Sequence, residues 1–501
     1  QERVGRMGFG VCLINLPIVH RTGDPFGDIP FMPTGVMYLA GHLRARGVEV
    51  SILDAFGLAP ARHYRLDGQL SAVGLTEDEI VARLGDARLV GVSVHSGMSH
   101  HFALRLAAKI RAARPGVPLV AGGHHPSAVW GEFLAGGYDY VAVGEGEAPL
   151  LHLARSLRDG VDDTDRIPGL ACAGAPPTPA LREEDLDACG FAAADLLPLE
   201  NYWALGMSHA PVRGRYIAIT TSRGCPFNCR FCTTPRLLGR QWRTRSPRHI
   251  ADEIEFFARR HGVEDIIIQD EAFGTRRDIA RGLAEEIIAR GLKVRIHLPS
   301  GVRLESLDEE TLAALRAAGL VYMCLAPESG SERVRERMGK PLDTARLLRI
   351  ASCARRLGIR VGAFFILGFE GETEEDRRMT RGLAAALTRR GLDEISVFIW
   401  TPLPGAEAFG GATGWARYED LNWSPAWRRD YPALRRARRR LYLRWLAEKA
   451  LFHPVELGLS LARALSGHCE LKGEAALRRM LAGVFRALGA PLRRPPDGGS
   501  G

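Results

Sequence analysis

The chain has 501 residues, of which 46% are hydrophobic and 25% are charged. These values are typical of a globular protein and exclude a disordered or fibrous chain. Since domains average roughly 150 residues, the length favours about three domains. The formal charge of +9 comes from 67 Lys and Arg against 58 Asp and Glu, and seven of the arginines lie between Arg428 and Arg440. Such a run is most often a solvated helix face, although it could also attract an anionic substrate or a nucleic acid.

The sequence shows neither a membrane span nor an export signal. No run of 18 or more apolar residues occurs, and residues 1–6 lead into a short apolar run without a signal-peptide cleavage pattern. The nine cysteines are too sparse for a disulfide scaffold, but three of them fall within eight positions. This clustering indicates metal in a reducing compartment, so we expect a cytoplasmic protein.

Residues 1–158 alternate short apolar runs with helix-like stretches. The apolar runs are residues 11–16, 48–54, 89–94, 118–121 and 138–143. Between them lie segments such as 102–114, in which apolar residues recur at i, i+3 and i+4. The alternation predicts an α/β domain with a doubly wound parallel sheet. In such a sheet ligands bind at the carboxyl ends of the strands, where this sequence has glycine-containing loops.

Residues 159–212 lack this rhythm and contain Ala175-Pro176-Pro177-Thr178-Pro179, which indicates a connecting segment.

Strand–helix alternation returns over residues 213–405. The predicted strands there are residues 216–221, 265–269, 293–298, 321–326, 361–367 and 394–401, and Ser306 with Glu309 has the spacing of a capping box at a helix start. Six β/α units favour an open, partial barrel whose active site lies where the strands end. Residues 406–501 are expected to be helical and arginine-rich, with a loose tail at 495–501.

The strongest signal is Gly224-Cys225-Pro226-Phe227-Asn228-Cys229-Arg230-Phe231-Cys232, which follows the first predicted strand of the barrel. Its spacing is Cys-x3-Cys-x2-Cys, and thiolates are soft ligands that suit zinc or an iron–sulfur cluster. A closed structural zinc site needs four ligands, and the next histidine is only at His249. Three thiolates on a cubane would leave one iron without a protein ligand, free to chelate a small molecule and pass it an electron. A zinc knuckle or a chance cluster is the weaker alternative.

This triad, with the aromatic Phe231 before its third cysteine, resembles that of the radical S-adenosylmethionine (SAM) enzymes. Later segments resemble further motifs of that family in the right order. Residues 265–273 are similar to its second strand, 326–332 to its fourth-strand glutamate-serine-glycine motif, 365–376 to its fifth-strand glycine motif and 401–405 to the end of its sixth strand. The resemblance implies a radical SAM partial (β/α)6 barrel with a [4Fe-4S] cluster on Cys225, Cys229 and Cys232.

SAM carries an amine and a carboxylate beside its sulfonium, and each needs a partner of complementary charge. Asp270 or Glu271 could hold the amine, and Arg303 or Ser300 could hold the carboxylate, because all four follow predicted strands of the barrel. Each of them alone could equally be a surface group. The resemblance adds four further SAM contacts, which are Phe231, Glu328, Ser329 and Gly368.

The N-terminal half resembles the Rossmann-like cobalamin-binding domain that precedes the barrel in one large subclass, class B, of radical SAM enzymes. The segments that carry this resemblance are residues 33–40, 52–55, 91–98, 121–126 and 143–147. Small residues such as Gly122 and Gly123 let the backbone approach the nucleotide tail of cobalamin closely. The expected cobalamin contacts are His95, Ser96, Gly97, Gly122, Gly123, His124, Pro126, Gly144, Glu145 and Gly146. A domain for another nucleotide, or for none, is the alternative.

One departure from many cobalamin proteins concerns the lower ligand of cobalt. Those proteins carry Asp-x-His-x-x-Gly after the first strand, whereas the loop here, residues 15–23, lacks the Asp-x-His pair. The barrel-fused subclass commonly lacks it too, so the assignment stands. His20, His95, water or no ligand at all remain open as the lower axial ligand.

Some side chains have two interpretations. Cys12 and Cys324 lie in predicted strands and are expected to be small core residues, and Cys353 lies on a predicted helix. A catalytic thiol at Cys324 would instead imply a different methylation mechanism. Trp423, Trp427 and Tyr431 either close over a substrate or pack the helical C-terminal domain.

The resemblance implies a cobalamin-dependent radical SAM methyltransferase that places a methyl group on an unactivated carbon of a small-molecule or natural-product intermediate. Methylcobalamin would deliver the methyl group, and a 5'-deoxyadenosyl radical made from a second SAM would abstract hydrogen from the substrate. The alternatives are a ring closure, ring contraction or other rearrangement with the same cofactors, and a redox sensor without catalysis. We expect an external electron donor such as flavodoxin or ferredoxin, a substrate that is acidic or carrier-bound and lies between the two domains, and no nucleic acid.

Overall fold

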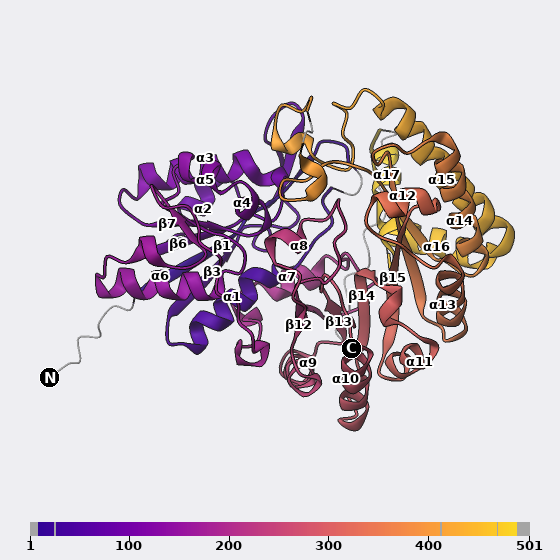
Figure 1. Ribbon diagram of the computed structural model, residues 1–501, viewed down its shortest axis with the longest axis horizontal. Coiled ribbons are helices and arrows are strands. Elements are labelled where there is room, and N and C mark those ends of the chain that lie inside the picture. Colours follow the sequence, from indigo (N-terminus) through magenta and orange to yellow (C-terminus); the bar gives the residue numbers. More distant parts are fainter. Residues whose placement is uncertain (1–8, 25–26, 411–412, 468, 488–501) are drawn as a thin grey trace.

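The computed structural model describes residues 9–24, 27–410, 413–467 and 469–487 (Figure 1). The start at residues 1–6 and the predicted loose tail at 495–501 lie outside these ranges. The N-terminal sheet and its helices form one lobe, the second sheet lies in the middle, and the C-terminal helices cover the far side (Figure 1).

The N-terminal sheet has the strand order β3-β1-β6-β7-β8-β9. Its strands are β1 (Gly10–Asn15), β3 (Glu49–Asp54), β6 (Leu89–Ser93), β7 (Leu119–Gly122), β8 (Tyr140–Ala142) and β9 (Leu170–Cys172). The first five are parallel, which confirms the predicted doubly wound sheet, and β9 joins antiparallel from the connecting segment. On β1, Cys12 and Ile14 enter one buried cluster and Val11 and Leu13 another, so both faces of the sheet are covered.

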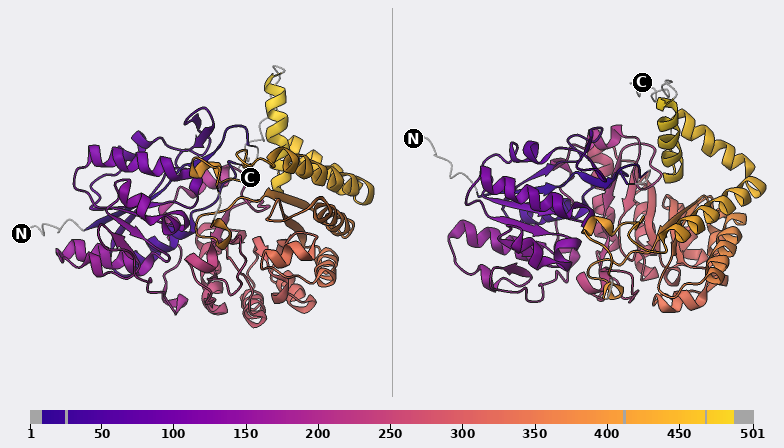
Figure 2. Two further views of the ribbon diagram at one scale, coloured as in Figure 1. Left: turned by 45° about the horizontal axis from the view of Figure 1, so that its top comes forward. Right: turned by 90° about the horizontal axis from the view of Figure 1, so that it is seen from above.

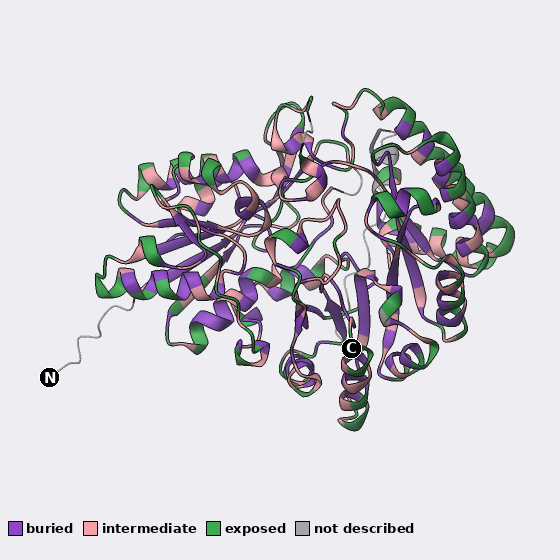
Figure 3. Ribbon diagram, viewed as in Figure 1, coloured by how far each residue is buried: buried purple, intermediate pink, exposed green. Residues whose placement is uncertain are grey.

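The helices of this lobe cover those two faces (Figures 1 and 3). They are α1 (Thr34–Ala45), α2 (Glu77–Val81), α3 (His100–Ala113), α4 (His124–Ala128), α5 (Trp130–Ala135) and α6 (Glu147–Asp159). A small antiparallel sheet, β2 (Ile18–Arg21), β5 (Leu70–Val73) and β4 (His63–Arg65), follows the loop after β1. His20 pairs with Ser71 in this sheet and is buried, so it lies in a strand rather than in an open loop.

The second sheet has six parallel strands in sequential order, with β10 and β17 at its two edges. Its strands are β10 (Tyr216–Ile219), β13 (Asp265–Ile268), β14 (Arg295–Val302), β15 (Leu320–Glu328), β16 (Arg360–Leu367) and β17 (Glu394–Ile399). All six strands were predicted, and the sheet is the open barrel that the alternation indicated. Met323 and Leu325 enter the cluster that contains the outer helices, so Tyr322 and Cys324 face the inside of the barrel.

The helices that follow these strands pack on the outside of the barrel. They are α9 (Pro247–His261), α10 (Arg277–Ala289), α11 (Glu309–Ala317), α12 (Glu332–Arg337), α13 (Thr344–Arg356) and α14 (Glu374–Arg389). Two short helices lie elsewhere: α7 (Leu199–Ala204) precedes β10, and α8 (Thr234–Leu237) lies between β11 (Ser222–Arg223) and β12 (Arg243–Thr244). The capping box at Ser306 was a wrong prediction. Residues Leu304–Ser306 form a 3-10 turn, and Asp308 caps α11 by accepting the amide N–H of Thr311.

The C-terminal part is helical, as predicted, with α15 (Tyr431–Phe452), α16 (Pro454–Ser466) and α17 (Lys472–Ala487). Leu434, Ala437 and Leu441 are the buried face of α15 against the barrel, whereas Arg435 and Arg439 are exposed. The arginines of α15 at 435, 436, 439 and 440 are therefore on a solvated helix face, whereas Arg428 precedes the helix, is 12% exposed and donates to the carbonyls of Trp400 and Gly368. In the described ranges, no helix is long and apolar enough to cross a membrane.

Candidate active site

The three thiols lie on one loop, residues 224–242, which we call the cysteine loop. Its base is a two-stranded antiparallel ladder of β11 (Ser222–Arg223) and β12 (Arg243–Thr244), with Arg223 opposite Arg243. Inside the loop, the Cys225 amide donates to the carbonyl of Gly239 at 3.3 Å, and the Cys232 amide donates to that of Cys229 at 3.0 Å. These bonds hold all three cysteines at the carboxyl end of β10.

Two cations lie beside the thiols. Burial raises the pKa of Cys229 to about 11, while the charges of Lys340 and Arg303 oppose this shift. Arg303 Nη1 lies 3.8 Å from the Cys229 sulfur, and its guanidinium stacks 3.5 Å above the ring of Phe227. Cations next to a thiol favour the thiolate, which is the form that binds metal.

These surroundings fit an iron–sulfur cluster, in which each thiolate binds its own iron atom. Nowhere in the described ranges do three His, Cys, Asp or Glu side chains come together around a point that could hold a single metal ion. The donor set of this loop is therefore three separate thiols with two neighbouring cations.

Phe231, Glu328 and Lys340 form the wall next to the thiols. Lys340 Nζ donates to Glu328 Oε1 at 2.6 Å, both groups are buried, and the ammonium lies 6.0 Å from the Phe231 ring centre. Glu328 has a φ of 60° at a register shift that ends the β15–β16 ladder. A left-handed backbone costs free energy at a non-glycine residue, so its neighbours must hold it there.

Ser329 and Gly368, two of the other predicted SAM contacts, bond to protein groups. The Ser329 hydroxyl is buried, lies 3.2 Å from the hydroxyl of Thr380 and accepts the amide of Ser331. The carbonyl of Gly368 accepts a bond of 2.9 Å from Arg428 Nη2. Both residues therefore shape the strand ends, and their contact with SAM stays a prediction.

The two acids after β13 have different surroundings. Asp270 is buried and accepts three bonds of 2.5–2.7 Å, from the amide and hydroxyl of Thr221 and from the hydroxyl of Ser222. Glu271 Oε2 is also buried, but it has no hydrogen-bond partner within the described part of the chain, and burial raises the pKa of this carboxyl to about 7. Glu271 is thus the acid that is left for a ligand amine.

Ser300 and Arg303 follow the same strand but differ in exposure. Ser300 is exposed near the end of β14, whereas the Arg303 side chain is 12% exposed and reaches the thiols. Of the two candidates for the SAM carboxylate, Arg303 is the one beside the cysteine loop.

The loops after β6 and β7 lie together at the carboxyl edge of the N-terminal sheet. His95 and Ser96 are exposed, and the His95 ring lies 5.2 Å from the ring of His124. Burial lowers the pKa of the His124 imidazole to about 4, so this ring is neutral at pH 7. Gly123 has a φ of 107°, and a Cβ there would lie 2.7 Å from the carbonyl oxygen of Val94.

The other predicted cobalamin residues lie around this edge. Gly122 ends β7, Pro126 is buried in α4, and Gly146 immediately precedes α6. The Gly144 amide donates to the Ser127 hydroxyl at 3.0 Å. Their roles toward cobalamin stay predictions.

Glu145 has a contact that the sequence analysis missed. Its buried carboxylate pairs with Arg223 at 3.4 Å and with Arg243, the two cross-strand partners at the base of the cysteine loop. Arg223 also pairs with Glu147 at 2.5 Å. We call these four residues the interdomain clamp. They join the carboxyl end of β8 in one sheet to the carboxyl end of β10 in the other.

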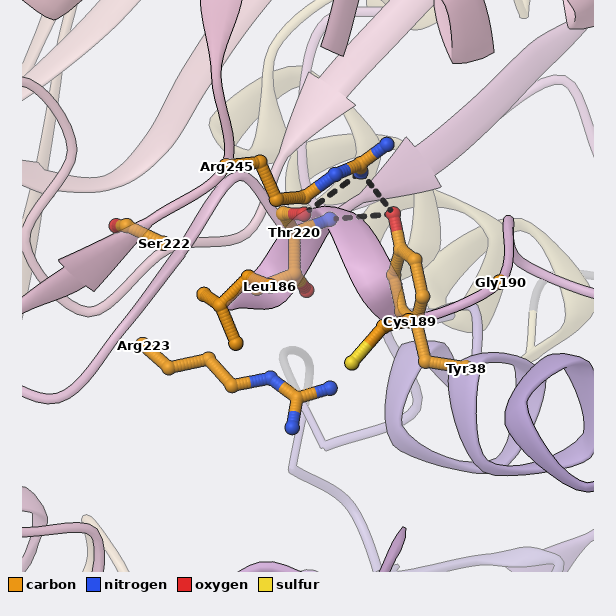
Figure 4. Close-up of a pocket in the computed structure, with 8 residues that line it drawn as sticks. All are labelled: Tyr38, Leu186, Cys189, Gly190, Thr220, Ser222, Arg223 and Arg245. Atoms are coloured by element: carbon orange, nitrogen blue, oxygen red, sulfur yellow. Dashed lines mark hydrogen bonds between the residues drawn. The ribbon is translucent and has the colours of Figure 1, made fainter. Parts of the chain in front are cut away.

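A small pocket lies behind this clamp, where the connecting segment packs between the two sheets (Figure 4). Its lining is Tyr38, Leu186, Cys189, Gly190, Thr220, Ser222, Arg223 and Arg245. The Tyr38 hydroxyl accepts bonds of 3.1 Å from the Thr220 amide and from Arg245 Nη1. The base of the cysteine loop is therefore also bonded to α1.

A second link crosses above the sheets. Residues 413–423, which we call the C-terminal strap, run from the barrel to the N-terminal lobe (Figure 1). Buried Glu419 accepts a bond of 3.0 Å from the His101 amide and lies 2.8 Å from its ring Nδ1, and Trp423 Nε1 donates to Asp24 at 2.9 Å. Trp427 instead donates to the carbonyl of Asp420, and Tyr431 packs on the barrel core. Of the three aromatic residues that were considered, Trp423 lies between the lobes.

Comparisons with known proteins match these two sheets. Residues 219–384 match the Radical SAM superfamily, and residues 30–154 match the B12 binding domain. The chain is 30% identical over 420 residues to cytidylyl-2-hydroxyethylphosphonate methyltransferase of Streptomyces wedmorensis, covering 75% of this chain and 76% of that protein. It is 27% identical over 391 residues to the anaerobic magnesium-protoporphyrin IX monomethyl ester cyclase of Rubrivivax gelatinosus, covering 75% and 65%.

Among solved structures, the fold is similar to that of the radical SAM methyltransferase TsrM from Kitasatospora setae with cobalamin and a [4Fe-4S] cluster bound. The TM-score is 0.63 at 22% identity, covering 80% of this chain and 77% of that one. This similarity extends over both sheets.

Proposed function

Because this chain belongs to the cobalamin-dependent radical SAM enzymes, we propose that it is a C-methyltransferase that acts on an unactivated carbon of a small-molecule or natural-product intermediate. The observation that carries the proposal is the interdomain clamp, since it brings together the ligand-binding edges of the two sheets. The similarity to a methyltransferase over three quarters of the chain supports methyl transfer as the reaction.

When bound, the [4Fe-4S] cluster, SAM and cobalamin supply the electron, the radical precursor and the methyl carrier. Cys225, Cys229 and Cys232 would hold the cluster. Glu271, whose buried Oε2 has no hydrogen-bond partner in the described part of the chain, would hold the SAM amine, and Arg303 would hold its carboxylate. Glu328 keeps the Lys340 ammonium beside the thiols, where its charge favours the thiolates.

The residues of the N-terminal edge fit cobalamin in a similar way. His95, Ser96 and His124 offer hydrogen-bonding groups at the ends of β6 and β7. Gly122 and Gly123 place no side chain at this edge, and a Cβ at Gly123 would clash with the carbonyl oxygen of Val94. The C-terminal strap would keep water out from above, because it bonds to His101 and Asp24 of the N-terminal lobe and to Thr401 after the last barrel strand.

A rearrangement with the same cofactors is the second candidate, and the similarity to a cyclase favours it. Products distinguish the candidates. The full chain, loaded with cluster and cobalamin, is incubated with SAM and a low-potential reductant that stands in for an external donor such as flavodoxin or ferredoxin. S-adenosylhomocysteine together with 5'-deoxyadenosine supports methyl transfer, and deoxyadenosine alone supports rearrangement. If neither product forms although the cluster is reduced, both candidates are wrong. A redox sensor without catalysis would then be the remaining interpretation.

A further inference from the structure

Just before α17, at residues 470 and 471, the chain turns back into the open side of the barrel. Glu470 pairs with Arg213, just before β10, at 3.0 Å and with Arg360, at the start of β16, at 2.6 Å. Leu471 is buried against Tyr322 and Cys324, which face the inside of the barrel. This turn therefore lies across the gap between the edge strands, and α17 stands beside the strands (yellow in Figure 2).

Lys472, the first residue of α17, presents its ammonium to this inner face. Its Nζ lies 5.5 Å from the ring centre of Phe364 on β16, and the side chain is partly buried. No ion pair or hydrogen bond joins this ammonium to another group within the described part of the chain.

A row of aromatic rings leads from Lys472 toward the N-terminal lobe. Phe364 lies 5.7 Å from Phe398 on β17, and Phe398 lies 6.0 Å from Trp423 of the C-terminal strap. Both phenylalanines are partly exposed, whereas Phe365 and Val397, their neighbours on the outer face, are buried. The inner face of β16 and β17 is thus open to solvent along this row.

We propose that Lys472 binds an anionic group of the substrate, a carboxylate or a phosphate-like oxyanion, while an apolar part of the substrate lies along Phe364, Phe398 and Trp423. An aromatic face replaces only part of the stabilisation that an ammonium group loses when it is partly withdrawn from water. A bound anion would supply the remaining stabilisation by pairing with the charge. The row ends at Trp423, which bonds to the N-terminal lobe, so the apolar part would extend toward the interface of the two sheets. Only the identification of this ligand as the substrate rests on the proposed function.

Calorimetric binding of small probes tests the proposal without turnover. The full chain, loaded with cluster and cobalamin, is titrated with phenylacetate, with phenylphosphonate and with neutral phenylacetamide. We expect at least one anion to bind wild type, to bind Lys472→Met about tenfold more weakly and to bind Lys472→Arg as well as wild type. Phenylacetamide should bind both wild type and Lys472→Met equally. The anion that binds more tightly identifies the oxyanion class.

Arg436→Met, an exposed substitution on α15, is the matched control for loss of one positive charge and should leave all three affinities unchanged. Equal anion affinity in wild type and Lys472→Met, or no anion binding by wild type, would overturn the proposal. Unchanged circular dichroism and cluster absorbance show that Lys472→Met is folded, and Lys472→Gln gives the same test if it is not. Absence of S-adenosylhomocysteine would count against methyl transfer, but it would leave the binding result standing.

Discussion

Asp270 and Glu271 show how two adjacent acids acquire different roles. Asp270 uses both oxygens to fix Thr221 and Ser222, which precede the cysteine loop. Glu271 Oε2 has no such partner among the residues that the structure describes, and burial raises the pKa of this carboxyl to about 7. A carboxyl of this kind binds a proton readily unless a cation arrives, which suits a group that receives a ligand amine.

The raised pKa of Glu271 has a consequence for stability. Because the folded protein holds this proton more tightly than the unfolded chain, the stabilisation is complete below the ordinary value of 4.5 and is lost as the pH rises toward about 7. In the absence of SAM, we expect the melting temperature of wild type to fall relative to Glu271→Gln between pH 5 and pH 7. Parallel melting curves for the two proteins across this range would contradict it.

The cysteines make a sharper prediction. Cys229→Ala should abolish the visible absorbance of the iron–sulfur cluster and the formation of 5'-deoxyadenosine, because one iron would lose its thiolate. Cys172→Ala on β9 is the control, since this thiol lies in the N-terminal sheet, and it should retain both signals. The cluster assignment is falsified if both signals persist in Cys229→Ala.

The ladder of β11 and β12 closes the cysteine loop and turns it toward the other sheet. Arg223 and Arg243 are opposite each other in this ladder, and both reach Glu145. Charged side chains that are as deeply buried as these are tolerated because each is paired with an opposite charge. The ion pairs between this ladder and Glu145 therefore fix where the loop that carries the thiols lies relative to the N-terminal sheet.

Removing the shared carboxylate tests this link. Glu145→Gln should lower the free energy of unfolding by about 3 kcal/mol, because the nearly buried Arg243 loses its charged partner while Arg223 keeps only Glu147. Asp195→Asn is the matched control, since the Arg44–Asp195 pair is about half exposed and should contribute less than about 1 kcal/mol. Both values come from denaturant titration, and similar losses in the two variants would refute the clamp.

The two lobes are joined at two levels, by the clamp at the base of the cysteine loop and by the C-terminal strap above. Gly97 lies directly under the strap, since a Cβ there would lie 3.1 Å from the Tyr418 carbonyl oxygen. Glu419 bonds to the first turn of α3 through both the amide and the ring of His101. A ligand between the lobes would be enclosed by these contacts.

Glu419→Ala should therefore loosen this closure without unfolding either sheet. We expect faster amide hydrogen exchange in residues 413–423 and in the first turn of α3, because the strap loses its buried bonds to His101. Exchange in β14 and β15, which lie in the barrel, is the internal reference and should not change. Unaltered exchange in the strap would contradict its role as a closure.

Local patterns in the sequence determined most of the architecture. The parallel strands of both sheets were predicted from apolar runs, because burial on two faces requires such runs wherever they pair. The cysteine triad was predicted from spacing alone, and its place after a strand fixed the end of the barrel on which it lies. The C-terminal helices were also predicted, and the exposed arginines of α15, such as Arg435 and Arg439, occupy the solvated face that the charge run suggested.

Only the tertiary structure decided which of these groups meet. Glu145 was predicted to contact cobalamin, but its carboxylate pairs with Arg223 and Arg243, and no periodicity along the chain signals such a pair. Likewise, Asp270 and Glu271 were equivalent candidates until hydrogen bonding distinguished them, and Lys472 gave no signal before α17 was seen beside the barrel. The physical reason is that periodicity and spacing report short-range order, whereas charge pairing and burial depend on groups brought together from distant parts of the chain.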